Sequence, residues 1–167
     1  LINGWRLTPD LEKEKSAGLR EEINLEKEWQ KLQSLNINLI LLESDSYPRL
    51  LKEISHPPFG IYCLGALEYP SPAIAIVGTR NATPQGKEFA KSFANKLNGA
   101  GATIISGLAM GIDESAHRGA LENSGQTIAV LGTPLNYIYP RQNQKLAEEI
   151  IKAGGAVISE FPLNNEY

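Results

Sequence analysis

Two turns of this 167-residue chain carry residues suited to binding an anion. The first, Gly78-Thr79-Arg80, combines a glycine, a hydroxyl and a guanidinium, and Thr83 follows closely; the second is Ser106-Gly107. Glycine lets a ligand approach the backbone, hydroxyls donate hydrogen bonds, and the planar fork of arginine matches phosphate. These types and spacings predict anion binding, but Arg80 could instead cap backbone carbonyls of its own loop.

A third polar segment, residues 136–143, mixes aromatic, basic and amide side chains. Tyr139 offers a ring face, Arg141 a positive charge, and Gln142 and Asn143 two amides. Such a composition suits stacking on nucleic-acid bases while phosphates are held. The alternative is that the tyrosines of this segment pack beneath the helix that follows, and the sequence leaves both interpretations open.

Short apolar runs precede these turns and indicate how they are positioned. The runs are rich in Ile and Val, alternate with helical patterns and recur at about the thirty-residue spacing of a βα unit; they are 73–77, 103–106, 127–131 and 156–160. Such runs are typical of buried parallel strands, whose carboxyl ends line the ligand crevice of an open α/β sheet. We therefore predict an open, mainly parallel sheet with flanking helices.

The helices between the strands have recognisable ends. Thr83 is a favourable N-cap with Pro84 at the first helical position, and Asn98-Gly99 should end this helix. Further helices are expected at about 112–125 and 143–155. The inner stripe of the first helix is expected to comprise Phe89, Phe93 and Leu97 together with Ala90 and Ala94.

The part of the chain before residue 70 has a different character. Residues 7–35 are dense in Glu and Lys with apolar residues at helical spacing, and strands are expected at 37–41 and 59–64. Two prolines in 69–72 predict a stiff connector. We expect a helical and mixed N-terminal segment over 1–70 and the α/β domain over 71–167. The chain begins without Met and is expected to be a fragment.

Composition excludes several classes of protein. No apolar run approaches the roughly 20 residues of a membrane-spanning helix, and the one cysteine, Cys63, excludes a disulfide framework. A buried thiol and a reducing cytoplasm are expected. The net charge is −3, with 8 basic and 11 acidic residues in 1–72 and 8 of each in 73–167. A broad basic surface for duplex DNA is therefore not expected, whereas a local anion site in the second part is compatible with this charge.

The strand ends lack the usual catalytic and cofactor motifs. There is no G-x-G-x-x-G after the first strand, and Gly86-Lys87 is followed by Glu88 rather than by the Ser or Thr of a phosphate-binding P-loop. His117 is expected to be a packed, hydrogen-bonded residue and Asp113 a helix cap rather than a ligand. We predict no catalytic residue, no metal and no cofactor.

Taken together, these strings resemble the DNA-processing protein A family, also called DprA or Smf. The strings follow one order from residue 47 onward: Tyr47-Pro48-Arg49-Leu50-Leu51, Ala75-Ile76-Val77-Gly78-Thr79-Arg80, Ser106-Gly107-Leu108-Ala109, Gly111-Ile112-Asp113, Tyr139-Pro140 and Ser159-Glu160. The resemblance implies a Rossmann-like domain that binds single-stranded DNA, protects incoming strands in natural transformation and helps to load a RecA-type recombinase. It also implies a homodimer in the intact protein and no enzymatic activity.

The family's binding residues fall on positions already singled out. The resemblance places phosphate contacts at Arg80, at Ser106-Gly107 and in the loop Arg141-Gln142-Asn143. The candidate site is Gly78, Thr79, Arg80, Thr83, Ser106, Gly107, Tyr139, Arg141, Gln142 and Asn143. Met110 departs from the pattern, since many members have a basic residue there. The family's arginine-rich Phe-Pro-x-Arg-Asn-Arg string is not reached by Tyr167, so part of the pocket is expected to be absent.

Two alternatives stay open. One is a nucleotide-processing enzyme of a related group, the nucleoside-monophosphate phosphoribohydrolases, although Gly132-Thr133-Pro134 does not supply the Pro-Gly-Gly-x-Gly-Thr turn that this class needs. The other is a structural or scaffold domain. That interpretation fits the acidic first part but leaves the polar strand ends unexplained.

Overall fold

The structure is a computed structural model that describes residues 24–67, 72–123 and 125–163. The chain divides into two compact units, residues 1–35 and 36–167. In the first unit, helix α2 spans Leu25–Ser34 and begins at Asn24, whose side chain accepts a hydrogen bond from the backbone N–H of Lys27. The rest of the helical segment expected at 7–35 lies outside the described residues.

The second unit contains a six-stranded sheet in the order β1-β2-β6-β5-β4-β3. Its strands are β1 Asn38–Leu41, β2 Gly60–Gly65, β3 Ala73–Ala75, β4 Thr103–Ser106, β5 Thr127–Leu131 and β6 Ala156–Ser159. Strands β3 to β6 pair in parallel, and β2 pairs antiparallel with both β1 and β6. The predicted fold class is confirmed. Because β2 pairs with β6, the sheet pairing extends across the boundary expected near residue 70.

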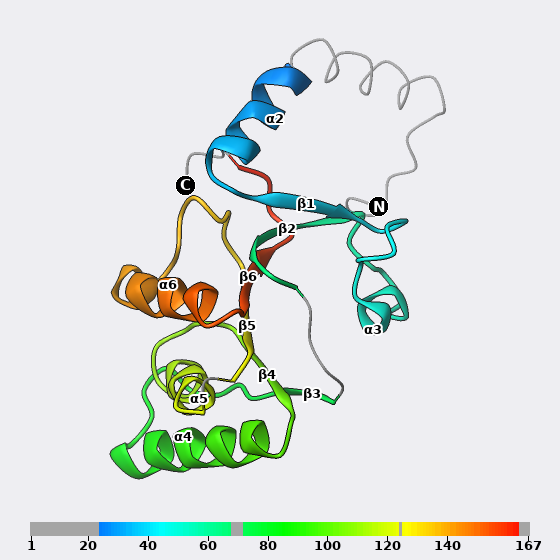
Figure 1. The fold of residues 1–167 in the computed structure, drawn as a ribbon. Coiled ribbons are helices and arrows are strands. Elements are labelled where there is room, and N and C mark those ends of the chain that lie inside the picture. The colour runs from blue at the N-terminus through cyan, green and yellow to red at the C-terminus, as the bar shows by residue number, and fades with distance from the viewer. Residues whose placement is uncertain (1–23, 68–71, 124, 164–167) are drawn as a thin grey trace, which may run out of the picture. The chain divides into compact units, whose positions relative to one another are not determined.

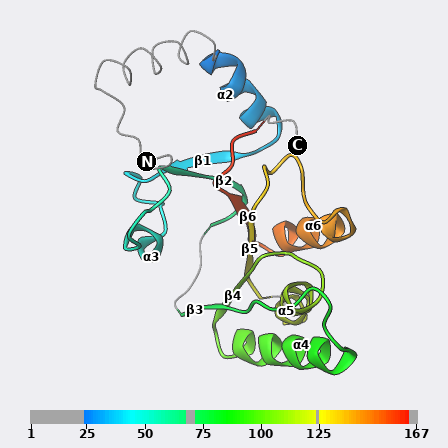
Figure 2. The same cartoon turned by 180° about the vertical axis from the view of Figure 1, so that it is seen from behind.

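The helices that connect the parallel strands lie on one face of the sheet (Figure 1, Figure 2). They are α4 Pro84–Gly99, α5 Ile112–Leu121 and α6 Gln144–Lys152, the last preceded by a 3-10 turn at Arg141–Asn143. Strands β3 to β6 follow one another in space as in sequence, so right-handed crossovers place every connecting helix on the same side. The short helix α3, Arg49–Lys52, lies on the other side (Figure 1). In the described part of the chain, no helix is both long and apolar enough to cross a bilayer.

Helix α4 begins as predicted, but its two phenylalanines do not face inward. The Thr83 side chain accepts a hydrogen bond from the N–H of Gly86, 3.1 Å away. Ala90 and Ala94 are buried, whereas Phe89 is 70% exposed and stacks on the exposed ring of Phe93. The expected inner position of both rings was wrong. Helix α4 packs closely on α5, and the small side chains occupy that contact.

Gly119 in α5 makes the close approach of these helices possible. A Cβ at this position would overlap the backbone carbonyl of Lys91 in α4. The carbonyl of Gly119 itself accepts a hydrogen bond from the side-chain amide of Asn95, 3.3 Å away. The backbones of the two helices are therefore in close contact at Gly119.

Replacing Gly119 by alanine is expected to destabilise the fold by a net ~1 kcal/mol, since overpacking costs about 1–3 kcal/mol and helix propensity returns up to about 1 kcal/mol. Urea unfolding of the two proteins measures this difference. Gly132→Ala is the matched control, because a Cβ there meets no atom within 4 Å. Equal stability of the Gly119 variant and the wild type would show that the helices separate without cost.

The two faces of the sheet carry separate apolar clusters. On the helix face, Ile104 packs with Ala94, Ala116 and Ala120. On the other face, Cys63 belongs to a cluster with Ile128 and Ile158, and burial raises the pKa of its thiol to about 11. The prediction of a buried thiol is confirmed. Because its pKa is raised, this thiol remains protonated at neutral pH.

Candidate nucleic-acid interface

The loops that leave β3, β4 and β5 meet around a cavity of about 200 Å³. Its lining comes from all three loops and consists of Arg80, Gly107, Ala109, Met110, Gly132, Thr133, Tyr139 and Pro140. Three predicted site residues, Arg80, Gly107 and Tyr139, are thus brought together from positions nearly sixty residues apart in the sequence. The carboxyl ends of parallel strands share one edge of the sheet, which explains the convergence.

Arg80 supplies a free positive charge to this cavity. Its side chain is exposed, and within the described residues no hydrogen bond or ion pair engages its guanidinium. The alternative role, capping backbone carbonyls of its own loop, therefore has no support in the geometry. Five N–H donors in a planar fork remain available for a phosphate.

Tyr139, which lines the same cavity, has a side chain that is open to a ligand. It is 53% exposed, which disagrees with packing beneath α6, and a cis peptide bond joins it to Pro140. Arg141 and Gln142 are exposed in the next turn but do not line the cavity, and the Arg141 guanidinium lies over the Tyr137 ring, 5.9 Å from its centroid. A flat aromatic face in the same cavity as the free guanidinium of Arg80 is a combination that can stack on a base and hold a phosphate.

Two side chains that were predicted to bind a ligand instead make hydrogen bonds within the protein. The Ser106 hydroxyl, 2% exposed, donates to the backbone carbonyl of Ile76 at 2.6 Å. The Asn143 side chain is buried and donates to the carbonyl of Leu108 at 2.9 Å. Leu108 has a φ of 59°, so this bond holds a strained backbone position. We reassign both side chains from ligand contact to shaping the loops, because their donors are satisfied and covered.

Two threonines and Gly78 also serve the loops. The Thr79 hydroxyl accepts from the N–H of Asn81 at 3.2 Å, and Thr83 is occupied as the cap of α4. Gly78 leaves room for Ile112, since a Cβ there would lie 2.7 Å from that side chain. These residues set the shape of the turn that presents Arg80.

Asp113 does not act as the expected helix cap. Helix α5 begins at Ile112 after Gly111, and the buried carboxylate of Asp113 accepts hydrogen bonds from the N–H groups of Gly78 and Gly107, each at 3.1 Å. The cap prediction was wrong because it considered only the charge of the helix end. The carboxylate instead connects two turns.

Met110 was missed as a site residue. It is 42% exposed and lines the same cavity as Arg80. Two signals could have pointed to it: its position in a turn directly after a predicted strand, and the basic residue that many family members have there. Among the described residues, no group of three or more His, Cys, Asp and Glu side chains could hold a metal ion.

A larger hollow of about 470 Å³ lies on the face of the sheet opposite α4 to α6. It is lined by apolar residues of α3 and the strands, such as Leu50, Ile105 and Ile128, with Ser159 and Glu160 at its end. This surface lacks cations and converging donors. The smaller cavity is the better candidate for a charged ligand, because its lining includes the free guanidinium of Arg80.

Fold and site together define an α/β protein with a cavity at the carboxyl ends of its parallel strands, lined in part by an arginine that is unpaired among the described residues. The chain belongs to the DNA recombination-mediator protein A family, whose sequence pattern matches residues 38–167. It is 40% identical to the protein Smf of Synechocystis over 158 residues, which cover 92% of this chain and 39% of that protein. The family resemblance inferred from the sequence strings is confirmed.

Two solved structures are similar to this one. The crystal structure of DNA processing protein A from Streptococcus pneumoniae has a TM-score of 0.74 and 31% identity, over 98% of this chain and 55% of that one. DNA processing protein A from Helicobacter pylori, solved to describe its single-stranded DNA binding mode, has a TM-score of 0.67 and 32% identity over 78% and 58%. The chain thus spans about two fifths of the Synechocystis relative and a little over half of these structures.

Proposed function

We propose that this chain binds single-stranded DNA in the cavity at the strand ends. The observation that carries the proposal is the free guanidinium of Arg80 in the same cavity as the exposed ring of Tyr139. In this arrangement Arg80 binds a backbone phosphate and Tyr139 stacks on a base. The relative from Helicobacter pylori, described for its single-stranded DNA binding, supports the same ligand.

A single strand fits this surface better than a duplex. Base faces are accessible for stacking only when they are unpaired, and a duplex is bound mainly through many phosphate contacts. The chain has a net charge of −3, and its described cavity offers one cation rather than a basic stripe. Selectivity for single strands therefore comes from the Tyr139 face, and affinity from a small number of charges.

We propose further that binding, rather than catalysis, is the activity, and that the intact protein works in the cytoplasm. There it would protect incoming single strands during transformation, form a homodimer and hand DNA to a RecA-type recombinase. Membership of the recombination-mediator family supports this role. Because the chain spans only part of its relatives, dimer formation and recombinase contact are proposed for the longer protein.

Fluorescence anisotropy tests the proposal. We expect a labelled oligothymidylate to bind more tightly than a duplex of the same length, with an affinity that falls as salt is raised. Replacing Tyr139 by leucine, which keeps apolar bulk but removes the aromatic face, should weaken binding by about tenfold, since stacking contributes about 1–3 kcal/mol per base. Equal affinity for single strand and duplex, or no binding, would contradict the proposal.

Replacing Met110 by lysine is expected to strengthen binding. The new ammonium would join Arg80 at the cavity and neutralise one more phosphate. We expect about threefold to tenfold tighter binding at low salt and a log-affinity against log-salt slope steeper by about 0.7. Met110→Gln, similar in length but uncharged, is the control. An unchanged salt slope for the lysine variant would show that the strand does not pass over residue 110.

A further inference from the structure

The buried carboxylate of Asp113 lies between two loops of the candidate site. Its Oδ1 accepts from the N–H of Gly78 and its Oδ2 from the N–H of Gly107, both at 3.1 Å. Gly78 follows β3 and Gly107 follows β4, so one side chain joins the ends of two strands. The carboxylate lies close against Gly107, since a Cβ at that residue would lie 2.7 Å from Oδ2.

The two loops also touch through their backbones. The N–H of Ile112 donates to the carbonyl of Thr79 at 3.3 Å, and a Cβ at Gly111 would overlap that same carbonyl. Gly111 has a φ of 90°, a conformation that favours glycine. The turn that carries Arg80 thus rests on the turn that carries Met110, with the Asp113 carboxylate beside this contact.

Backbone N–H groups at such strand ends bind ligand phosphates in nucleotide-binding α/β proteins. Here the amides of Gly78 and Gly107 are already paired with a carboxylate of the chain itself. Two amides that share one anion hold their turns at a fixed spacing, and a charge-assisted bond is stronger than a neutral one. These two amides are therefore not free to bind a DNA phosphate, whereas the guanidinium of Arg80 is.

We propose that Asp113 is a positioning residue for DNA binding, whose buried carboxylate fixes the Gly78 turn against the Gly107 turn and so presents Arg80 to the strand. This proposal rests on the proposed function for its DNA-binding consequence. Asp113 touches no ligand. It acts through the backbone two residues before Arg80 and three residues before Met110.

The sign of the effect separates positioning from simple electrostatics. Removing a negative charge near a DNA site should strengthen binding if charge alone matters. Replacing Asp113 by asparagine leaves one oxygen acceptor and places an NH₂ donor against the second amide. Because one turn then loses its partner, positioning predicts weaker binding despite the gain in positive charge.

The test compares Asp113→Asn with Glu114→Gln. Glu114 is the next residue and carries the same charge, and its carboxylate accepts a hydrogen bond from the side chain of Arg118, one helical turn further on, at 3.0 Å. We expect the Asp113 variant to bind oligothymidylate about tenfold more weakly, within the coupling of one hydrogen-bond network, and the Glu114 variant to bind as well as wild type or slightly better. Unchanged or tighter binding by Asp113→Asn would overturn the proposal.

A double-mutant cycle identifies the route of the effect. In an Arg80→Ala background, Asp113→Asn should cause little further loss, because the group that it positions is gone. A full additional loss would overturn the assignment to Arg80. Circular dichroism and urea unfolding of each variant separate loss of the fold from loss of the site.

Nuclear magnetic resonance on the free protein tests the positioning without DNA. In the wild type, we expect scalar couplings across the hydrogen bonds from the amides of Gly78 and Gly107 to the Asp113 carboxyl carbon. In Asp113→Asn, the amide signals of Thr79 and Arg80 should shift or broaden, and those in Glu114→Gln should not. Absent couplings and unmoved signals would overturn the proposal even if DNA binds. If the wild type bound no DNA while these signals behaved as expected, the proposed function would fail and the structural role of Asp113 would stand.

Discussion

Replacing Arg80 by alanine is expected to weaken the binding of single-stranded DNA by about thirtyfold at low salt. Hydrogen bonds between a charged group and its partner contribute about 1.5–3 kcal/mol, and each tenfold change in affinity corresponds to about 1.4 kcal/mol. Arg80 lines the cavity and, within the described ranges, makes no other bond, so its loss removes a phosphate contact and leaves no buried partner unpaired.

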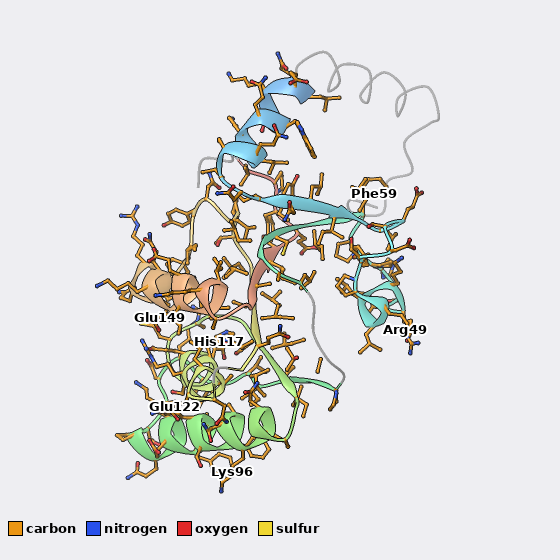
Figure 3. The ribbon with its side chains drawn as sticks, viewed as in Figure 1. Arg49, Phe59, Lys96, His117, Glu122 and Glu149 are labelled. Carbon is orange, nitrogen blue, oxygen red and sulfur yellow. The ribbon has the colours of Figure 1, made fainter. Side chains whose placement is uncertain are left out.

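The salt dependence of the Arg80 variant tests the same contact. Removing one phosphate contact should reduce the log-affinity against log-salt slope by about 0.7 for a single strand. Arg49→Ala is the control, since Arg49 lies exposed on α3, which lines the other face of the sheet (Figure 3). Equal losses in the two variants would mean that only net charge matters and would remove Arg80 from the site.

Acid is expected to destabilise the fold through His117, which is fully buried in α5 (Figure 3). The Thr127 hydroxyl donates to the carbonyl of Ile104 at 2.7 Å, so its oxygen accepts the Nδ1 proton of His117 at 2.8 Å. The network thus assigns the neutral Nδ1–H form to the imidazole. The prediction of a packed, hydrogen-bonded histidine is confirmed.

Burial lowers the pKa of His117 to about 3, and a backbone hydrogen bond involving Ser106 offsets part of this lowering. Histidines in an unfolded chain have a pKa near 6.5. Below that pH, His117 therefore binds a proton in the unfolded state but stays neutral in the folded state. The contribution of His117 to stability is complete above pH 6.5 and is lost as pH falls toward 3. Between pH 7 and pH 5 we expect a loss of about 2 kcal/mol.

Urea unfolding at several pH values measures this loss. His117→Gln keeps an N–H donor for Thr127 but cannot titrate, so it should lose less stability than wild type between pH 7 and pH 5. His56→Gln is the control, because His56 is exposed and its ring contacts only the neighbouring Ser55 hydroxyl. If wild type and His117→Gln lost equal stability over this range, His117 would not control the acid response.

The fold was largely predictable because most residues of β4, β5 and β6 are buried. The runs expected at 103–106, 127–131 and 156–160 contain β4, β5 and β6, whereas β3 covers only the first three residues of the run 73–77. In buried parallel strands nearly every residue is apolar, so the whole run indicates a strand. The phenylalanines of α4 were predicted on the wrong face because helical spacing does not show how close a neighbouring helix lies. At Gly119, the backbone of α5 approaches α4 too closely for large side chains to fit between the helices.

The site was predictable only in part. The structure places Arg80, Gly107 and Tyr139 around one cavity, which could be expected because strand ends converge in every open α/β sheet. Ser106 and Asp113 were misjudged because Ser106 bonds to Ile76, 30 residues away, and Asp113 bonds to Gly78, 35 residues away, as well as to Gly107. Residue type does not reveal whether a donor or acceptor is already used. Whether a polar residue at a strand end contacts a ligand or stabilises a loop can therefore be decided only when its hydrogen bonds are known.

The most direct test of the central claim is to titrate a ¹⁵N-labelled sample of the chain with a short oligothymidylate and to follow the backbone amide signals. We predict saturable shifts that cluster at Arg80, Gly107, Met110, Gly132 and Tyr139, the residues around the strand-end cavity. Shifts that cluster instead at α3 and the apolar hollow, or no shifts at all, would contradict single-stranded DNA binding at this site.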